Sequence, residues 1–446
     1  MRERMEQRVE YYIKKLQNKQ EYADIINRCK AVSIDEKVYA VGFLPILTEY
    51  IKWVLINASR AGKKRLYFLA RDGYQMYILA KTLSDKWNLG IECRYLNVSR
   101  YAIRVPEYHL LGDRCLEYIC SGGIDVTFEK VMKRAALTDE EAMSIAGLCN
   151  REVTYKNILN YSQVMELKTE LSKIPEFMEY VTAHSKDVYD NTVGYLEQEG
   201  LMDEIPYSLV DSGWVGTLQK SIEHLVKSVN PMVEITGYYF GMYEYPKDID
   251  KEKYNAFYFS PEKGMKNKVY FSNCLFEAVF TSPEGMTVGY TQAKEGYIPL
   301  YDLTRNPNQE TIDRYVSLLY NFLDSYTEGF PSAYCYKKSL RMVKSIAYKM
   351  MGSPEYEESE AFGGLLFCDD LLEKSLQMVA AKLEYADIRN LRAIPRIMII
   401  KGLKSGVIRD SAWIEGTIVR NARHVGFNLW HAHMYKYLVY LRKRLR

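Results

Sequence analysis

One stretch, residues 65–98, reads as a strand, a helix and a second strand in direct succession, and this pattern constrains the fold more than any other feature. Arg65-Leu-Tyr-Phe-Leu-Ala70 is a short continuous apolar run after a basic turn, which is typical of a strand buried on both faces of a sheet. Residues 74–87 have helical periodicity, and residues 93–98 resemble the next strand. Two strands joined by a helix in this way normally lie parallel, so the sequence predicts a parallel α/β sheet.

The same succession recurs after residue 205. Pro206-Tyr-Ser-Leu-Val210 has strand character, residues 211–217 form a glycine-rich turn, and a helix is expected over 218–226. Residues 234–242 and 254–259 add two more strand-like segments, which gives a sheet of about five strands. We therefore predict a Rossmann-like α/β fold, with a doubly wound and mostly parallel sheet, a helical insertion and a C-terminal helical lobe.

The chain is long enough for more than one lobe, and we predict five segments. They are N-terminal helices packing on the core (1–58), two parts of the α/β domain (59–111 and 206–295), a cap-like helical insertion (112–205) and a C-terminal helical lobe (296–446). Within these segments we expect helices at 3–30, after the capping-box pattern Ser33-Ile-Asp-Glu36, and at 311–326, 339–351, 371–383 and 429–446.

Composition argues against several classes of protein. The 60 Lys and Arg residues nearly balance the 57 Asp and Glu residues, which does not favour nucleic acid as a partner. The eight cysteines are scattered singly without a zinc-type spacing, as expected for a reduced cytoplasmic protein. The chain has no run of about 18 uncharged apolar residues, so we expect no transmembrane segment.

Asp72 is the first candidate functional residue because it follows directly on the first predicted strand. Gly73 comes next and can adopt a positive φ, so Asp72 is expected at the carboxyl edge of the sheet, where open α/β sheets bind ligands. Arg71 and Arg100 are expected along the same edge as charge stabilisers, through bidentate pairing with a phosphate or with Asp72 or Asp211. A purely structural ion pair is the alternative.

The turn that follows the strand at 206–210 is the second candidate. Ser212, Gly213, Gly216 and Thr217 stand just before a helix, so backbone N–H groups and the helix dipole would favour an anion, most simply a phosphate. Asp211 could hold a metal ion, a sugar hydroxyl or a transferable proton, and Trp214 could offer a flat face to a sugar or base. Glycines placed for close packing alone are the structural alternative.

Two further residues belong to the predicted site. Ser99 follows the second strand and should lie on the same edge of the sheet as a phosphate contact. Glu277 lies in a segment, 273–290, that joins a short helix to a polar turn and was expected to close the cleft as a lid. Glu277 is a candidate base, metal ligand or substrate contact, with a plain carboxylate on a helix surface as the alternative.

The segment Tyr67-Phe-Leu-Ala-Arg-Asp-Gly73 resembles the nucleophile loop of haloacid-dehalogenase-like phosphatases. The position of that family's nucleophilic aspartate is Ala70, which cannot attack phosphorus, and only the second aspartate, the general acid, is kept as Asp72. Together with Val210-Asp-Ser-Gly-Trp-Val-Gly-Thr217, the segment is similar to the region that follows the phosphatase domain in bacterial predicted hydrolases of that superfamily. The resemblance covers roughly residues 35–290, and it implies a setting in surface-polysaccharide biosynthesis beside glycosyltransferases.

Two functions from different classes follow from these observations. The first is an enzyme, a hydrolase or transferase, that binds a phosphorylated sugar or nucleotide-sugar, with Asp72 and Asp211 as acid and base or as Mg²⁺ ligands. The second is a non-catalytic scaffold or regulator that assembles polysaccharide-biosynthesis proteins, such as a glycosyltransferase, since the expected nucleophile is absent. Both hypotheses depend on whether the segments around Asp72 and Asp211 lie close together in the structure.

Overall fold

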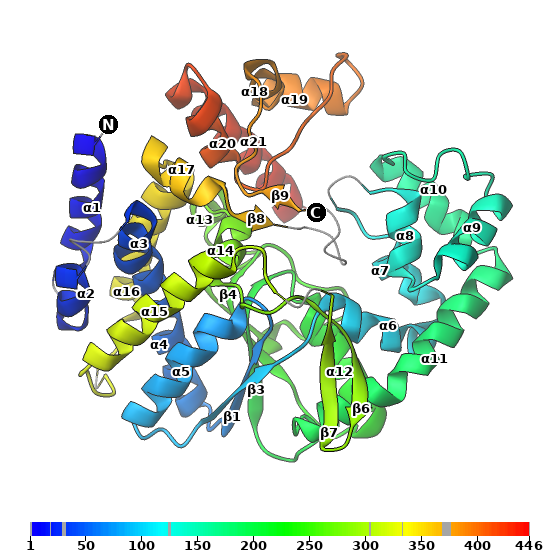
Figure 1. Cartoon of the computed structure of the whole chain (residues 1–446), viewed down its shortest axis with the longest axis horizontal. Coiled ribbons are helices and arrows are strands. Elements are labelled where there is room, and N and C mark those ends of the chain that lie inside the picture. The colour runs from blue at the N-terminus through cyan, green and yellow to red at the C-terminus, as the bar shows by residue number, and fades with distance from the viewer. Residues whose placement is uncertain are drawn as a thin grey trace.

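The centre of the molecule is a sheet of five parallel strands in the order β2-β1-β3-β4-β5 (Figure 1). The computed structural model describes residues 2–17, 19–28, 33–123, 126–302, 305–331, 333–367 and 376–445. The strands are β1 (Arg65–Leu69), β2 (Glu92–Leu96), β3 (Tyr207–Trp214), β4 (Thr236–Met242) and β5 (Tyr254–Phe259). The predicted Rossmann-like α/β fold is confirmed.

The strand order places a topological switch between β1 and β3. From β1 the chain passes through α5 (Gly73–Lys86) to β2 on one side, and it later returns to place β3 on the other side of β1. Connections that leave neighbouring strands in opposite directions open a crevice at the carboxyl ends of those strands. The loop after β1, which carries Asp72, and the carboxyl end of β3, which carries Asp211, therefore flank the expected position of a ligand site.

Both faces of the sheet are buried, as the apolar run of β1 predicted. Leu66 and Phe68 point into a large core shared with α4 (Leu44–Arg60) and α5. The alternate residues Tyr67 and Leu69 point into a second core on the opposite face. That second core includes side chains from α11 (Pro175–Gln198) and α12 (Thr217–Val229).

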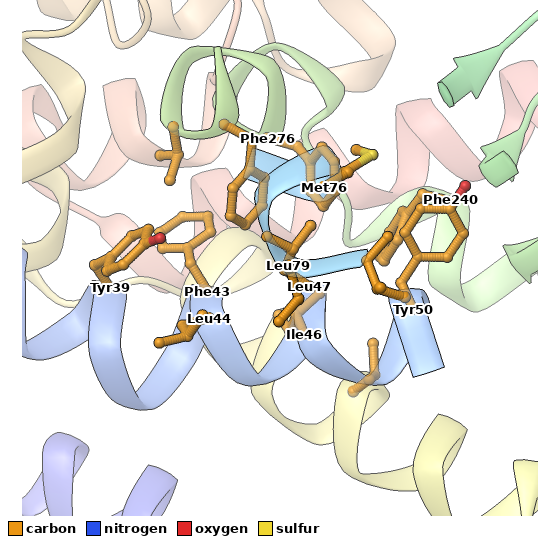
Figure 2. Close-up of a cluster of buried hydrophobic side chains, with 14 of the residues drawn as sticks. Tyr39, Phe43, Leu44, Ile46, Leu47, Tyr50, Met76, Leu79, Phe240 and Phe276 are labelled. Atoms are coloured by element: carbon orange, nitrogen blue, oxygen red, sulfur yellow. The ribbon is translucent and has the colours of Figure 1, made fainter. Parts of the chain in front are cut away.

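A long helical segment before β1 forms the centre of the larger core. It consists of α3 (Ile34–Val38), a π-helical turn (Tyr39–Phe43) and α4, and its N-terminus has the capping box expected at Ser33 and Glu36. Figure 2 shows side chains from this segment meeting Met76 of α5, Phe240 of β4 and Phe276. Residues 34–60 are long and apolar enough to cross a membrane, but 94% of the apolar window is buried inside the protein, as in a core helix.

The helices between β2 and β3 form a group to one side of the sheet (Figure 1) and have a hydrophobic core of their own. The first of them, α6, continues directly from the end of β2, and the last, α11, packs along α6 and leads back to the sheet. These helices are α6 (Arg100–Leu111), α7 (Leu116–Ile119), α8 (Phe128–Arg134), α9 (Asp139–Leu148), α10 (Tyr161–Leu171) and α11.

Part of the predicted C-terminal lobe belongs to the main core, whereas Ile388, Ile414, Ile418, Leu429 and Ala432 form a small core of their own. Tyr315, Ile346, Phe362 and Trp413 are buried in the same core as the sheet and α4, because the intervening helices pack on the N-terminal helices. The helices that precede or follow the sheet are α1 (Arg2–Leu16), α2 (Ala23–Arg28), α13 (Met265–Val269), α14 (Asn273–Phe280), α15 (Gln309–Ser325), α16 (Tyr336–Ala347), α17 (Tyr356–Gly363), α18 (Tyr385–Asn390), α19 (Ala393–Ile400), α20 (Ile414–Asn421) and α21 (Val425–Leu445).

Two local predictions of helices were wrong. The expected helix at 3–30 is divided into α1 and α2 by a short 3₁₀ turn. The expected helix at 371–383 lies partly outside the described residues, and its described part pairs as strand β9 (Gln377–Met378) with β8 (Leu366–Phe367). The segment predicted as a lid, 273–290, leads into a hairpin, β6 (Thr287–Ala293) and β7 (Gly296–Tyr301), because Lys294 and Glu295 form a tight turn before Gly296.

Candidate functional site

A cavity of about 320 Å³ lies at the carboxyl ends of β1 and β3, where the strand order changes direction. Its walls come from the loops after β1, β2 and β3, from α14 and from β8. The predicted residues that line it are Arg71, Asp72, Ser99, Arg100, Asp211, Ser212, Gly213, Trp214, Gly216, Thr217 and Glu277. The two acidic loops, more than 130 residues apart in the sequence, thus converge on one hollow.

The sheet itself determines where the two carboxylates lie. The chain leaves β1 at Leu69, passes a cis peptide bond between Ala70 and Arg71, and starts α5 one residue after Asp72. Asp211 lies within β3, opposite Tyr239 of β4, and its backbone carbonyl is 2.9 Å from the hydroxyl of Tyr50 on α4. Asp211 is thus held within the sheet, and Asp72 is held in the short turn between β1 and α5.

Burial raises the pKa values of both carboxylates. Removal from water, followed by the nearby charge of Asp72, raises the pKa of Asp211 to about 7. Burial likewise raises the pKa of Asp72, but a 2.5 Å hydrogen bond from the hydroxyl of Ser212 and the charges of Arg71 and Arg100 oppose that rise. Near neutral pH, Asp211 therefore readily holds a proton, while Asp72 has more support for its negative charge.

The glycine turn after Asp211 leads into α12, whose N-terminus faces the cavity. Gly213 has φ +112°, and a Cβ there would lie 2.4 Å from the carbonyl oxygen of Gly241. Gly216 has φ +71° and precedes the first residue of α12. The first N–H groups of a helix have no partner within the helix, so this end carries a partial positive charge that suits an anion. Close packing of the chain and an anion site are both consistent with these glycines.

Trp214 and Glu277 form one wall of the cavity together. The indole N–H of Trp214 donates a hydrogen bond to the carboxylate of Glu277. The ring also packs against four aromatic side chains, those of Tyr243, Phe259, Phe271 and Phe276. Trp214 is thus packed into the wall of the cavity and is less open for stacking than we predicted, because four aromatic side chains contact its ring.

Two other residues that we predicted as ligand contacts stabilise the packing of the fold. The hydroxyl of Ser99 donates a 2.6 Å hydrogen bond to the carbonyl of Thr287 and accepts one from the backbone N–H of Ala102, so it caps α6 and fixes the hairpin. Gly73 is not among the residues that line the cavity, and a Cβ there would lie 2.9 Å from the backbone carbonyl carbon of Phe68. Gly73 is required for the close approach of α5 to β1.

Arg104 is a residue that the sequence did not single out. Its side chain is 5% exposed, and its Nη2 donates a 2.7 Å hydrogen bond to the hydroxyl of Thr217, which lines the cavity. The guanidinium lies 4.4 Å from the centre of the Tyr118 ring, and burial followed by the charge of Arg100 lowers its pKa to about 10. The available signal was its position one helical turn after Arg100, on the same face of α6.

Metal binding would depend on Asp72 and Asp211. Among the described residues, no group of three or more His, Cys, Asp or Glu side chains is placed to hold a metal ion. Two carboxylates are nevertheless a suitable partial set for Mg²⁺, which commonly completes its octahedron with water and substrate phosphate. His431 and His433 lie on one helix, α21, and His433 contacts Glu415.

No protein-family model and no curated protein sequence matches this chain.

Proposed function

We propose that the chain binds a phosphorylated sugar or nucleotide-sugar in the cavity between β1 and β3 and acts on it as a hydrolase or transferase. The observation that carries this proposal is the shared cavity of Asp72 and Asp211 beside the N-terminus of α12. The helix end and the charge of Arg100 suit a phosphate group. The paired carboxylates suit proton transfer on the atoms attached to it.

The pKa values assign different roles to the two carboxylates. Asp211, with a pKa of about 7, would give a proton to the oxygen that leaves phosphorus. Asp72, whose charge is supported by Ser212, Arg71 and Arg100, would accept the proton of the attacking water or sugar hydroxyl. One phosphorus–oxygen bond forms and one breaks, so no covalent enzyme intermediate is needed. This route agrees with alanine at position 70.

We propose that Mg²⁺ binds in the cavity together with the ligand. Asp72 and Asp211 would hold the ion, which would neutralise charge on the phosphate oxygens. A metal bound by Asp211 would also remove its proton, so proton donation by Asp211 and metal binding by Asp211 are alternatives. A melting-temperature rise that needs both Mg²⁺ and phosphate would favour the metal.

A thermal-shift titration tests the proposal. Glucose 1-phosphate, UDP-glucose and inorganic phosphate, each with and without Mg²⁺, are expected to raise the melting temperature of the intact chain. Asp72→Asn and Asp211→Asn should remove that rise while each variant stays folded. Asp85→Asn, which changes an exposed aspartate on α5, is the matched control and should keep it.

A non-catalytic scaffold remains the second candidate function, and Ala70 is the observation that favours it. Such a protein would show no shift with any of these probes, and it would form a stable complex with a glycosyltransferase of its host. A resemblance to polysaccharide-cluster proteins motivates the bacterial, cytoplasmic setting in both cases. A melting-temperature rise that survives both asparagine substitutions would contradict the proposed site.

A further inference from the structure

Helix α19 and the loop after it project from the C-terminal part of the molecule, at the top of Figure 1. This tip, residues 393–409, exposes large aliphatic side chains to an unusual degree. Ile394 and Ile400 are each 60% exposed, Leu403 is 70% exposed and Val407 is 69% exposed. A contiguous segment with this many exposed aliphatic side chains is typical of an interaction surface rather than of ordinary solvent-facing chain.

The tip is held in one conformation. The N–H of Gly402 donates to the carbonyl of Ile399, and the N–H of Leu403 donates to the carbonyl of Met398, as in a Schellman motif. Gly402 has the positive φ, +69°, that this motif requires. The loop is therefore locked onto the end of α19, with Leu403 beside the last turn.

Two further contacts hold the loop against the helices. The side-chain amide of Asn390 donates to the carbonyl of Val407 at 3.2 Å, and Arg396 forms a 2.5 Å ion pair with Asp410. The exposed aliphatic side chains are thus presented by a fixed scaffold. Binding through them would not require the loop to be ordered first.

The charge of the tip has a single sign. Residues 389–409 contain six basic residues and no acidic residue, although the whole chain carries a net charge of only +3. Arg389, Lys401 and Lys404 are exposed and flank the exposed aliphatic side chains. Arg396 and Arg409 are exceptions, since they form ion pairs with the flanking residues Asp410 and Asp387.

We propose that this tip docks on an anionic lipid bilayer, with Ile400, Leu403 and Val407 entering the acyl boundary and Lys401 and Lys404 among the headgroups. Aliphatic side chains combined with exposed basic residues and no acidic residue match the chemistry of an interfacial membrane anchor. A protein partner would need a specific acidic and apolar counterpart. A bilayer supplies both properties at once, and this inference is independent of the proposed cavity function.

Vesicle flotation with the full chain tests the proposal. The protein should float with phosphatidylglycerol-containing vesicles at low salt, and much less with pure phosphatidylcholine vesicles or at high salt, because screening weakens the attraction. The variant Leu403→Ser/Val407→Ser should reduce the partition coefficient at least tenfold. Lys401→Glu/Lys404→Glu should abolish the preference for anionic lipid.

Matched control variants test whether binding depends on the tip itself rather than on exposed apolar side chains or net charge elsewhere. Val229→Ser/Met232→Ser removes exposed apolar side chains elsewhere, and Lys186→Glu/Lys294→Glu makes the same change of net charge on other exposed lysines. Both controls should float like the unaltered protein, and all variants should keep its melting temperature. The proposal is overturned if the chain does not float with anionic vesicles or if the control variants lose binding as much as the tip variants do. It is also overturned if sedimentation shows that the unaltered protein is a dimer and that the tip variants are monomers.

Discussion

The hydroxyl of Ser212, on β3, donates a 2.5 Å hydrogen bond to the carboxylate of Asp72, which follows β1. This contact joins the two strands between which the sheet changes direction. It also brings a hydrogen-bond donor to the carboxylate of Asp72, where it opposes the rise in pKa that burial causes. The contact therefore links the topology of the fold to the electrostatics of the cavity.

Replacing Ser212 with alanine is expected to destabilise the protein more at high pH than at low pH. The hydrogen bond stabilises the charged form of Asp72, so its loss should cost about 1–3 kcal/mol where Asp72 is ionised and less where it is protonated. Urea unfolding at pH 5 and pH 8 measures the difference. Ser208→Ala, on the same strand, loses a bond to the uncharged hydroxyl of Thr236, so its cost should not depend on pH.

Arg104 and Thr217 are expected to act as one unit in stability. The buried guanidinium donates to the Thr217 hydroxyl, so Arg104→Met and Thr217→Val each remove the same hydrogen bond. A double-mutant cycle in urea should give a coupling energy of about 1–3 kcal/mol, since a charged donor is involved. Strictly additive effects of the two substitutions would show that the contact contributes nothing.

The sequence predicted the sheet and its functional edge because both depend on local signals. Apolar runs that lead into Asp72 and Asp211 identify the two strands, although β3 continues past Asp211 to Trp214, and parallel strands place their carboxyl ends together. The position of the cavity follows from that rule and from the strand order. The sequence pattern did not predict the order of the strands in the sheet.

The errors at the site come from contacts that local patterns do not contain. Trp214 was expected to be open, but four aromatic residues from other segments pack against it. Arg104 was overlooked because an arginine on a helix is usually solvated, and its burial depends on Tyr118 and Thr217 from distant segments. The hairpin β6–β7 was overlooked because its polar residues resemble a loop until the two strands are paired.

Gly213→Ala is expected to destabilise the fold by at least about 2 kcal/mol, because the position combines a positive φ with a backbone clash. The new Cβ would lie 2.4 Å from the carbonyl oxygen of Gly241, inside the sheet, where little movement is possible. Chemical denaturation gives the free energy of unfolding. Gly289→Ala is the control, since a Cβ there meets no atom within 4 Å, and a loss as large as that of Gly213→Ala would contradict the steric account.

Asp211→Asn is expected to stabilise the protein at alkaline pH. Burial, with the charge of Asp72, raises the pKa of Asp211 to about 7 in the folded state, whereas an unfolded aspartate titrates near about 3.9. Between these values the folded protein binds more protons than the unfolded chain, so the contribution of Asp211 is fully present below about pH 4 and is lost as the pH rises through about 7.

Asparagine carries no charge, so it avoids this loss and can keep the hydrogen bond that the backbone N–H of Ser212 donates to Asp211 Oδ1. Because the side chain is only half-buried, the gain over the unaltered protein should be on the order of 1–3 kcal/mol at pH 8 and near zero at pH 4. Melting temperatures of both proteins from pH 4 to pH 9 measure it, with Asp85→Asn as the exposed control. A gain that is the same at every pH would mean that the carboxylate of Asp211 is not held away from water, and the acid role proposed for it would fail with that result.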